Sequence, residues 1–218
     1  MNKIIELKNI VKNYDSKKRV KVLNKLNFSF SAGKIYSIMG PSGSGKSTLL
    51  NILSLIDTPT SGKLKIDSRT INYSSISSND LLRAKKIGII YQDNNLLSDF
   101  TALENIYFAR LSIDDDKKKA VSESKKILRK LGLSNRENHL ASQLSGGEMQ
   151  RVAIARAIIN SPEIILADEP TGSLDAKNAK EVFKLLLKLK NKKRLIVFAT
   201  HNRYFANMAD CKIELISG

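Results

Sequence analysis

The sequence is poor in cysteine, histidine and long apolar runs, and each shortage excludes a class of protein. Cys211 is the single cysteine among 218 residues, so an intramolecular disulfide is excluded, which suits a reducing compartment. With only two well-separated histidines, a zinc site of the cysteine–histidine type is excluded as well. No apolar run approaches the ~18 residues needed to span a bilayer. Residues 1–10 lack the apolar stretch of a signal peptide, and none is expected.

Acidic residues are also scarce. There are 21 Asp and Glu against 37 Lys and Arg, which gives a net charge of +16. Such a charge could indicate nucleic acid, an anionic membrane surface or simply lysine-rich solvated faces. Lys outnumbers Arg by 27 to 10, and Arg is the side chain preferred for phosphate and base recognition. Nucleic acid is therefore the least favoured of the three interpretations.

Residues 40–48 read GPSGSGKST and carry the clearest chemical signal in the chain. They fit the pattern G-x-x-x-x-G-K-[ST], in which glycines let backbone N–H groups approach phosphate closely. Lys46 would supply a charge to the β- and γ-phosphates of a nucleotide, and Ser47 a hydroxyl to Mg²⁺. The apolar run at 34–39 suits a buried strand before the loop, and residues 47–56 suit a helix whose N-terminus faces the phosphates. We therefore expect a nucleoside triphosphate site.

Two adjacent carboxylates end another apolar run. Asp168 and Glu169 follow residues 164–167 in the sequence IILADEP, and ligands of open α/β sheets sit at the carboxyl ends of strands. Asp168 is suited to hold Mg²⁺, directly or through water, and Glu169 to orient or deprotonate an attacking water. The same residues would also suit a turn that ends a strand. The phosphate loop elsewhere in the chain favours the catalytic interpretation.

A third motif, LSGGE at 144–148, resembles the beginning of a capped helix. Ser145 would be the N-cap, and the N–H groups of Gly146 and Gly147 would offer a second anion site. Taken alone, these residues favour an ordinary capped helix over an anion site. However, six of the eleven glycines lie here, in the phosphate loop or at position 172. This concentration favours two phosphate-facing surfaces.

The apolar pattern predicts strands alternating with helices, which favours a mainly parallel α/β sheet. Strands are expected at 4–10, 20–30, 34–39, 63–67, 87–91, 164–167 and 195–199, with Val22, Leu26, Phe28 and Phe30 on one face of the second. Helices are expected at 47–56, 101–111, 117–131, 146–159 and 182–189, and loops at 58–62 and 74–78. We expect one domain over residues 1–218. Its core would comprise 1–92 and 160–218, with a helical subdomain at 93–159 inserted between them.

In order, these motifs resemble those of the ATP-binding cassette (ABC) ATPases over nearly the whole chain. GPSGSGKST resembles the Walker A loop, LSGGE the family signature and IILADE the Walker B strand. The resemblance implies an α/β P-loop NTPase fold of the ABC type. Such a fold has a mainly parallel sheet core, an N-terminal antiparallel β region and an inserted α-helical subdomain that carries the signature. It also implies ATP and Mg²⁺ as cofactors and ATP hydrolysis as the activity.

The resemblance assigns roles to further residues. Gln92 resembles the Q-loop glutamine, a Mg²⁺ ligand with Ser47 and Asp168, and His201 the switch histidine that stabilises the γ-phosphate. Residues 173–175 resemble the D-loop. The implied catalytic residues are Glu169, His201, Lys46 and Gln92. The implied nucleotide contacts are Tyr14, which would stack on adenine, then Gly40, Pro41, Ser42, Gly43, Ser44, Gly45, Lys46, Ser47 and Thr48, and from a second chain Ser145, Gly146 and Gly147.

One phosphate loop and one signature per chain imply a head-to-tail homodimer with ATP held between two cassettes. A finer similarity lies in YQDNNLLSDFTALENI, RENH and ADEPTGSLDAKNA, which resemble the ATPase subunits of lipoprotein-releasing exporters. This implies integral membrane permease subunits as partners, a peripheral place at the cytoplasmic face of the inner membrane, and no specific nucleic acid. Departures from this branch at Met149, Ser173 and 93–95 remove no catalytic group. The last of them lies where the membrane subunit would dock.

Other members of the family remain alternatives. Macrolide-export and cell-division ABC systems share the general pattern. The positive charge also suggests a soluble ABC ATPase acting on ribosomes or DNA, but translation-type members carry two cassettes and repair-type members a long coiled coil. Only 122 residues separate Lys46 from Asp168, too few for that insertion. A guanine-binding switch is discounted because no Asn-Lys pair continues to N-K-x-D.

Overall fold

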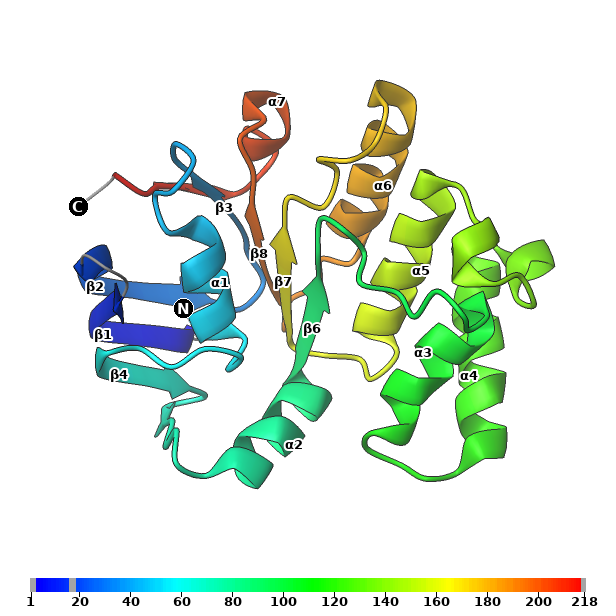
Figure 1. The fold of residues 1–218 in the computed structure, drawn as a ribbon, viewed down its shortest axis with the longest axis horizontal. Coiled ribbons are helices and arrows are strands. Elements are labelled where there is room, and N and C mark those ends of the chain that lie inside the picture. The colour runs from blue at the N-terminus through cyan, green and yellow to red at the C-terminus, as the bar shows by residue number, and fades with distance from the viewer. Residues whose placement is uncertain (1–2, 16–18, 217–218) are drawn as a thin grey trace. The chain divides into compact units, whose positions relative to one another are not determined.

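The computed structural model describes residues 3–15 and 19–216. The chain divides into two compact units, one built from the chain up to Arg83 together with the chain from Lys190 onward, the other from Ala84–Leu189. Figure 1 traces the elements of both units. Among the described residues, no helix combines the length and apolar character that a membrane span requires.

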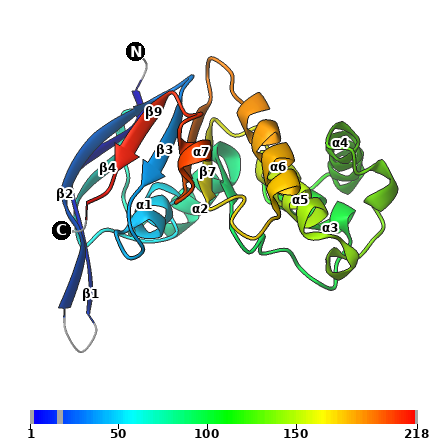
Figure 2. The same ribbon diagram turned by 90° about the horizontal axis from the view of Figure 1, so that it is seen from above.

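The first unit contains an antiparallel sheet, in which strand order is β2-β1-β4-β5. Figure 2 shows its two long strands, β1 and β2, running side by side. The expected N-terminal antiparallel region is therefore present, and its strands are longer than the sequence pattern indicated. Their bounds are Lys3–Asp15 for β1, Arg19–Ser31 for β2, Ser61–Ile66 for β4 and Arg69–Thr70 for β5.

One detail of β2 differs from the prediction. Opposite β1, Leu26 pairs with Ile10 but Leu23 pairs with Lys12, so the register shifts between these two pairs. Lys25, inside the shifted stretch, has a φ of 46°. Such an irregularity changes which side chains face the core, and Leu23 is buried whereas Val22 is half-buried. The expected apolar face was therefore wrong at Val22.

The first unit also contains parallel strands that carry the phosphate loop. The buried strand β3 (Ile35–Met39) pairs in parallel with β8 (Leu195–Ala199) on one edge and with β9 (Cys211–Glu214) on the other. Strand β9 was not predicted. The loop after β3 leads into helix α1 (Lys46–Leu53), and the short helix α7 (Arg203–Ala206) follows β8.

Residues 76–78 belong to helix α2 (Ile76–Lys86), so the expected loop at 74–78 was wrong over these residues. No residue of this helix is buried. An amphipathic pattern arises only where one face of a helix packs on a core. The serines and asparagine at its start therefore resembled an ordinary polar loop.

In the second unit, two parallel strands lead to the candidate catalytic residues. Strand β6 (Ile87–Ile90) pairs with β7 (Ile164–Asp168), with Ile87 opposite Ile164 and Ile90 opposite Ala167. The helices after β6 in this unit are α3 (Ala102–Leu111), α4 (Lys117–Lys130), α5 (Gly146–Ile158) and α6 (Ala176–Lys188), with single 3₁₀ turns at Ser134–Arg136 and Ala141–Gln143. The first three helices lie within one residue of their predicted bounds, whereas α6 begins six residues before the predicted 182.

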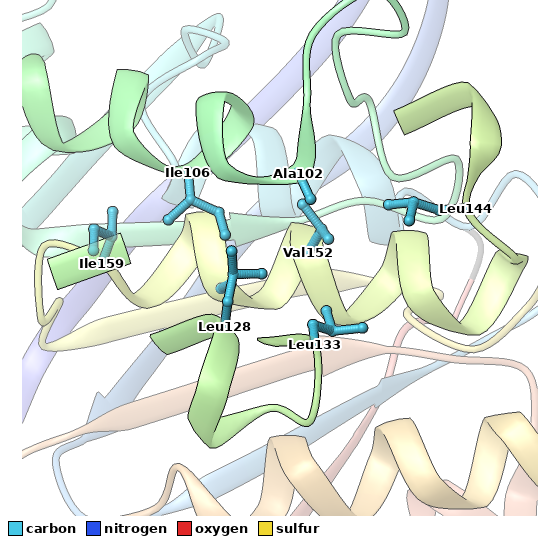
Figure 3. Packing of buried hydrophobic residues seen from close by; sticks show 8 residues of the cluster. Ala102, Ile106, Leu128, Leu133, Leu144, Val152 and Ile159 are labelled. Carbon is cyan, nitrogen blue, oxygen red and sulfur yellow. The ribbon is translucent and has the colours of Figure 1, made fainter. Parts of the chain in front are cut away.

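Helices α3, α4 and α5 share an apolar core, shown in Figure 3. Val152 of α5 and Ile106 of α3 are fully buried within it. All members of the core come from within residues 102–159, so this segment has buried apolar side chains of its own. They are Ala102, Ile106, Leu128, Leu133, Leu144, Val152, Ala155 and Ile159.

Candidate active site

The phosphate loop of the first unit has the backbone that its glycines predict. Gly45 is the N-cap of α1 with a φ of 93°, a left-handed conformation that only glycine adopts readily. A Cβ there would lie 2.9 Å from Cγ1 of Val22, so the loop packs directly on β2. No side chain caps this helix terminus, so its first N–H groups point toward the loop without a competing acceptor.

Lys46 and Ser47 begin helix α1. Nζ of Lys46 donates hydrogen bonds of 2.9 Å to the carbonyls of both Gly40 and Pro41, which holds the ammonium group over the loop. Ser47 is exposed and can offer its hydroxyl to a ligand. Of the other loop residues, Pro41, Ser42 and Gly43 are exposed, Gly40 and Thr48 are half-buried, and Ser44 and Gly45 are buried.

Tyr14 lies near the end of β1, opposite Val20 of β2. Its side chain is 41% exposed, and its hydroxyl donates to Oδ2 of Asp57 at 2.8 Å. Sequence reasoning did not identify Asp57, because nothing in the local pattern indicates a contact between positions 43 residues apart.

His201 follows β8 in the first unit. The N–H of Thr200 still donates to the carbonyl of Ile38 at 3.1 Å, so the pairing with β3 continues to this point. His201 is the next residue and is exposed. The structure therefore brings the predicted switch histidine to the end of β3 where the phosphate loop begins.

In the second unit, the ends of β6 and β7 bring Gln92 and Glu169 together. The parallel register puts Ile90 opposite Ala167, and each of the two residues follows two positions later. A Cβ on Gly172 would lie 3.2 Å from Nε2 of Gln92 and 3.4 Å from Cβ of Glu169, so both side chains flank this glycine. Asp168 is the last residue of β7 and is half-buried.

Glu169 has a φ of 44°. A non-glycine residue in this left-handed region costs free energy, and such residues cluster at functional sites. The turn that holds it is closed by a hydrogen bond of 2.9 Å from the N–H of Gly172 to the carbonyl of Glu169. The carboxylate after β7 therefore belongs to a defined turn.

The signature forms the capped helix start that the sequence predicts. Ser145 is the N-cap of α5 and forms a capping box with Glu148. Nε of Arg136 donates to Oε1 of Glu148 at 2.7 Å. This bond, together with those from Ser145, lowers the pKa of Glu148 to about 2.

Gly147 packs against helix α6. A Cβ at this position would lie only 2.5 Å from Oδ1 of Asn178, so glycine is needed for the close approach. Asn178 belongs to the first turn of α6, whose N-cap is Asp175 of the predicted D-loop. In the same loop, Oγ of Ser173 donates to the carbonyl of Gln92 at 3.3 Å. Within this unit the D-loop thus contacts the Q-loop, and the helix that the D-loop caps packs against the signature.

The segment after Gln92 is held by helix α5. Asn94 and Asn95 have φ values of 59° and 48°. The guanidinium of Arg156 donates to the carbonyls of both, with 2.7 Å between Nη2 and the carbonyl oxygen of Asn94. Asn94 is buried, so this part of the expected docking region does not present its side chain to solvent.

From Asn95 to Phe100 every residue except the half-buried Leu96 is exposed. Leu97 is 49% and Phe100 39% exposed, and Phe100 meets Phe108 of α3 edge-on with 5.1 Å between ring centroids. We refer to Leu97, Phe100 and Phe108 as the α3 apolar patch. Exposed apolar groups gathered in this way are typical of protein interaction sites.

Comparison with known proteins identifies the family. A model of the ABC transporter family matches residues 23–172, which include the phosphate loop, Gln92, the signature and both carboxylates. The chain belongs to the ABC transporter family. The expected ABC ATPase fold is confirmed by solved ATP-binding cassettes. One, a dimer in a post-hydrolysis state bound to ADP and phosphate, aligns with a TM-score of 0.90 and 37% identity over 99% of this chain and 95% of its own.

Curated relatives match this ABC ATPase over at least 90% of their length. The lipoprotein-releasing system ATP-binding protein LolD of Rickettsia bellii is 45% identical over 100% of this chain and 97% of its own length. LolD of Wigglesworthia glossinidia brevipalpis is 44% identical, with coverages of 99% and 95%. LolD 2 of Chlorobaculum tepidum is 41% identical, with coverages of 99% and 90%. The predicted resemblance to the lipoprotein-release branch of the family is thereby confirmed.

The donors expected for Mg²⁺ are a hydroxyl on Ser47, an amide oxygen on Gln92 and a carboxylate on Asp168. All are hard oxygen donors, which this cation prefers. Within residues 3–15 and 19–216, no cluster of three or more His, Cys, Asp or Glu side chains forms an alternative metal site. Hydroxyl, amide and carboxylate oxygens are chemically suited to Mg²⁺.

Proposed function

We propose that this ABC ATPase is the ATP-hydrolysing subunit of a bacterial lipoprotein-releasing transporter. The observation that carries the proposal is its identity of 41–45% with LolD proteins over 90% or more of both chains. No catalytic group of the family pattern is missing from the sequence, so hydrolysis is retained. The cargo is assigned from these relatives, because the nucleotide site itself does not contact it.

In this proposal the first unit binds the nucleotide. Lys46 and the loop N–H groups hold the phosphates, Tyr14 stacks on the adenine, and His201 contacts the γ-phosphate. The exposed loop residues and the uncapped start of α1 support this assignment. Ser47, Gln92 and Asp168 would hold Mg²⁺, which offsets phosphate charge when bound.

Glu169 is the proposed general base. Its carboxylate would accept the proton of a water that attacks the γ-phosphorus, while the bond to the ADP oxygen breaks and phosphate leaves. The turn closed by Gly172 supports this assignment, because it fixes the backbone from which the Glu169 side chain extends. We further propose that residues 93–159 form a helical subdomain that carries the signature, which their shared apolar core supports.

A second copy of the chain would complete each nucleotide site. Ser145, Gly146 and Gly147 of one cassette would contact the γ-phosphate bound to the other. Ser145 and Gly146 are exposed at the start of α5, as such a contact requires. Two solved relatives with 37% identity are themselves dimeric cassettes.

Integral membrane subunits are the proposed partners, with the ATPase at the cytoplasmic face of the inner membrane. Their contact would be the α3 apolar patch. A membrane transporter needs such a contact to couple hydrolysis in a peripheral subunit to movement in the bilayer. Leu97, Phe100 and Phe108 offer exposed apolar surface for it.

Crosslinking in membranes tests the transporter function. Ser98, which is exposed beside the patch, is replaced by cysteine in a Cys211→Ser background, and crosslinked partners are identified after gentle solubilisation. We expect a protein with membrane spans. Cysteine at Lys63, exposed on β4 of the other unit, serves as the control and should not capture it.

The identity of the crosslinked protein also distinguishes the proposed function from the other types of ABC ATPase. Ribosomal or nucleic-acid-bound proteins alone would favour the soluble class of ABC ATPase. A membrane partner that releases no lipoprotein would favour the macrolide-export or cell-division types. A lipoprotein-release assay with the purified complex decides between these, because only the proposed function predicts ATP-dependent release.

A further inference from the structure

A partly buried ion pair holds Tyr14 in place. Nζ of Lys12 lies 2.6 Å from Oδ1 of Asp57 and donates to the carbonyl of Thr58 at 2.8 Å. The other carboxylate oxygen of Asp57 accepts the Tyr14 hydroxyl at 2.8 Å. The side chains of Lys12 and Asp57 are 11% and 25% exposed. The charged groups are thus shielded, while the tyrosine ring they hold is open to solvent.

The positive charge of Lys12 balances the negative charge of Asp57. Burial raises the pKa of Asp57, but the hydrogen bonds from Lys12 and Tyr14 outweigh it and leave the pKa below its ordinary value. The carboxylate is therefore ionised at neutral pH. The ammonium group of Lys12 also lies over the ring of Tyr14, 4.8 Å from its centroid. With Lys12 in this position Tyr14 is still 41% exposed, so ring surface remains accessible to a stacking partner.

Asp57 also connects the ring to the phosphate loop. The N–H groups of Ile56 and Asp57 both donate to the carbonyl of Asn51, at 3.0 and 3.1 Å, so Asp57 is fixed to the last turn of α1. The first turn of that helix carries Lys46, Ser47 and Thr48 of the phosphate loop. An α-helix is stiff over this length, so Asp57 sets the distance between the tyrosine ring and the loop.

We infer that Asp57, held by Lys12, is a positioning residue for the base of the bound nucleotide. It keeps the ring of Tyr14 at the place where a purine can stack while the loop holds the phosphates. The inference rests on the proposed role of Tyr14 as the adenine platform. It assigns a role in nucleotide binding to Asp57 and Lys12, which do not touch the nucleotide. It predicts that substituting Asp57 weakens the binding only of ligands that carry a base.

Binding of ATP and of inorganic tripolyphosphate to the full-length protein tests this inference. Tripolyphosphate occupies the phosphate loop but has no base to stack. Asp57→Asn should weaken ATP binding by about 3–10-fold, with tripolyphosphate binding unchanged. Because stacking is ground-state binding, the same change should appear in KM for ATP and not in kcat.

Two further variants and a control distinguish loss of ring positioning from other effects of Asp57→Asn. Tyr14→Phe keeps the ring but removes the bond to Asp57, so it should reproduce the Asp57→Asn effect even if the latter variant folds poorly. Asp57→Asn should add nothing in a Tyr14→Ala background, because the ring it positions is gone. Asp80→Asn is the matched control, since it breaks a more exposed pair with Arg83 in the same part of the chain.

The possible failures are distinguishable. If Tyr14→Ala does not weaken ATP more than tripolyphosphate, the proposed role of Tyr14 is wrong. A second outcome is that Tyr14→Ala weakens ATP binding more than tripolyphosphate binding while Asp57→Asn and Tyr14→Phe leave ATP binding unchanged. In that case Tyr14 keeps its proposed role and the positioning inference is overturned. The inference is equally overturned if Asp57→Asn weakens both ligands, because Asp57 would then support the loop as a whole.

Discussion

Arg136 and Glu148 form an ion pair, with 2.7 Å between Nε and Oε1, and Glu148 belongs to the first turn of α5. The second carboxylate oxygen of Glu148 accepts from both the N–H and the hydroxyl of Ser145, each at 2.9 Å. The ion pair and the helix cap therefore depend on one side chain. Its substitution should loosen the signature, which is proposed to contact ATP.

Glu148→Gln should destabilise the protein in a pH-dependent way. The pKa of Glu148 is about 2 in the folded protein against an ordinary 4.5, so its contribution is complete above about pH 5 and lost as pH falls toward 2. Because solvent partly screens this ion pair, we expect Glu148→Gln to lower the free energy of unfolding by about 1–2 kcal/mol at pH 7. This corresponds to a decrease of roughly 3–6 °C in Tm. Thermal unfolding of both proteins followed by circular dichroism measures it.

The difference in Tm between wild type and Glu148→Gln should shrink below about pH 4.5. Glu163→Gln is the control, because the pair of Glu163 with Lys86 is 3.4 Å long and more exposed. Glu163→Gln should lower the free energy of unfolding by less than about 1 kcal/mol. A Glu148→Gln effect as small as that of the control would mean that the capping box does not stabilise the signature.

Lys46→Ala should weaken ATP binding by at least about tenfold and abolish hydrolysis. The variant removes the cation that faces the phosphates, and a hydrogen bond to a charged group contributes about 1.5–3 kcal/mol. Equilibrium binding and phosphate release measure both effects. Lys63→Ala, which removes an exposed lysine from β4, should leave both unchanged. Near wild-type turnover in Lys46→Ala would contradict the assignment of the phosphate loop.

Glu169→Gln should reduce turnover by about 10²–10⁴-fold, the typical contribution of a positioned general base. ATP binding should persist, since Lys46 and the loop N–H groups are intact. Bound ATP then favours whichever state binds it better, so the variant should dimerise with ATP in light scattering. Adding Ser145→Arg should keep it monomeric, because the signature then cannot approach the γ-phosphate.

The Glu169→Gln experiment has a matched control in Glu181→Gln. Glu181 is an exposed carboxylate on α6 with only a 3.8 Å contact to Arg151, so its loss should not alter turnover. Hydrolysis at the wild-type rate in Glu169→Gln would make Glu169 an ordinary residue of a turn. Trapped ATP without any dimer would mean that the membrane subunits bring the two cassettes together.

Arg156→Met should lower turnover more than ATP affinity. It leaves the carbonyls of Asn94 and Asn95 without their guanidinium donor, so the segment after Gln92 loses its left-handed conformation. Charge-assisted bonds of this kind contribute about 1.5–3 kcal/mol. Steady-state kinetics and hydrogen exchange over residues 90–97 measure the effect. Arg151→Met, on the same helix, is the control, and equal effects of the two variants would contradict the prediction.

Much of the fold could be predicted from the sequence because most helices and strands have a local pattern of apolar residues. Strands β3, β7 and β8 are short apolar runs, and helix α6 repeats its apolar residues with helical spacing. The prediction was wrong at the start of α2, which buries no residue, and at Val22, where a shift of register breaks the alternation. Strand β9 was missed because only its pairing with β3 makes it a strand.

The sequence by itself determined the chemistry of the phosphate loop and the family of the protein. The loop is nine consecutive residues whose conformation depends on its own glycines, and Asp168 and Glu169 directly follow the apolar run at 164–167. Only the tertiary structure decided that Asp57 holds Tyr14, that Asn178 packs on Gly147, and that Arg156 holds the segment after Gln92. These contacts join side chains from separate elements, and a local pattern of residues cannot specify which distant residue the folded chain will bring against them.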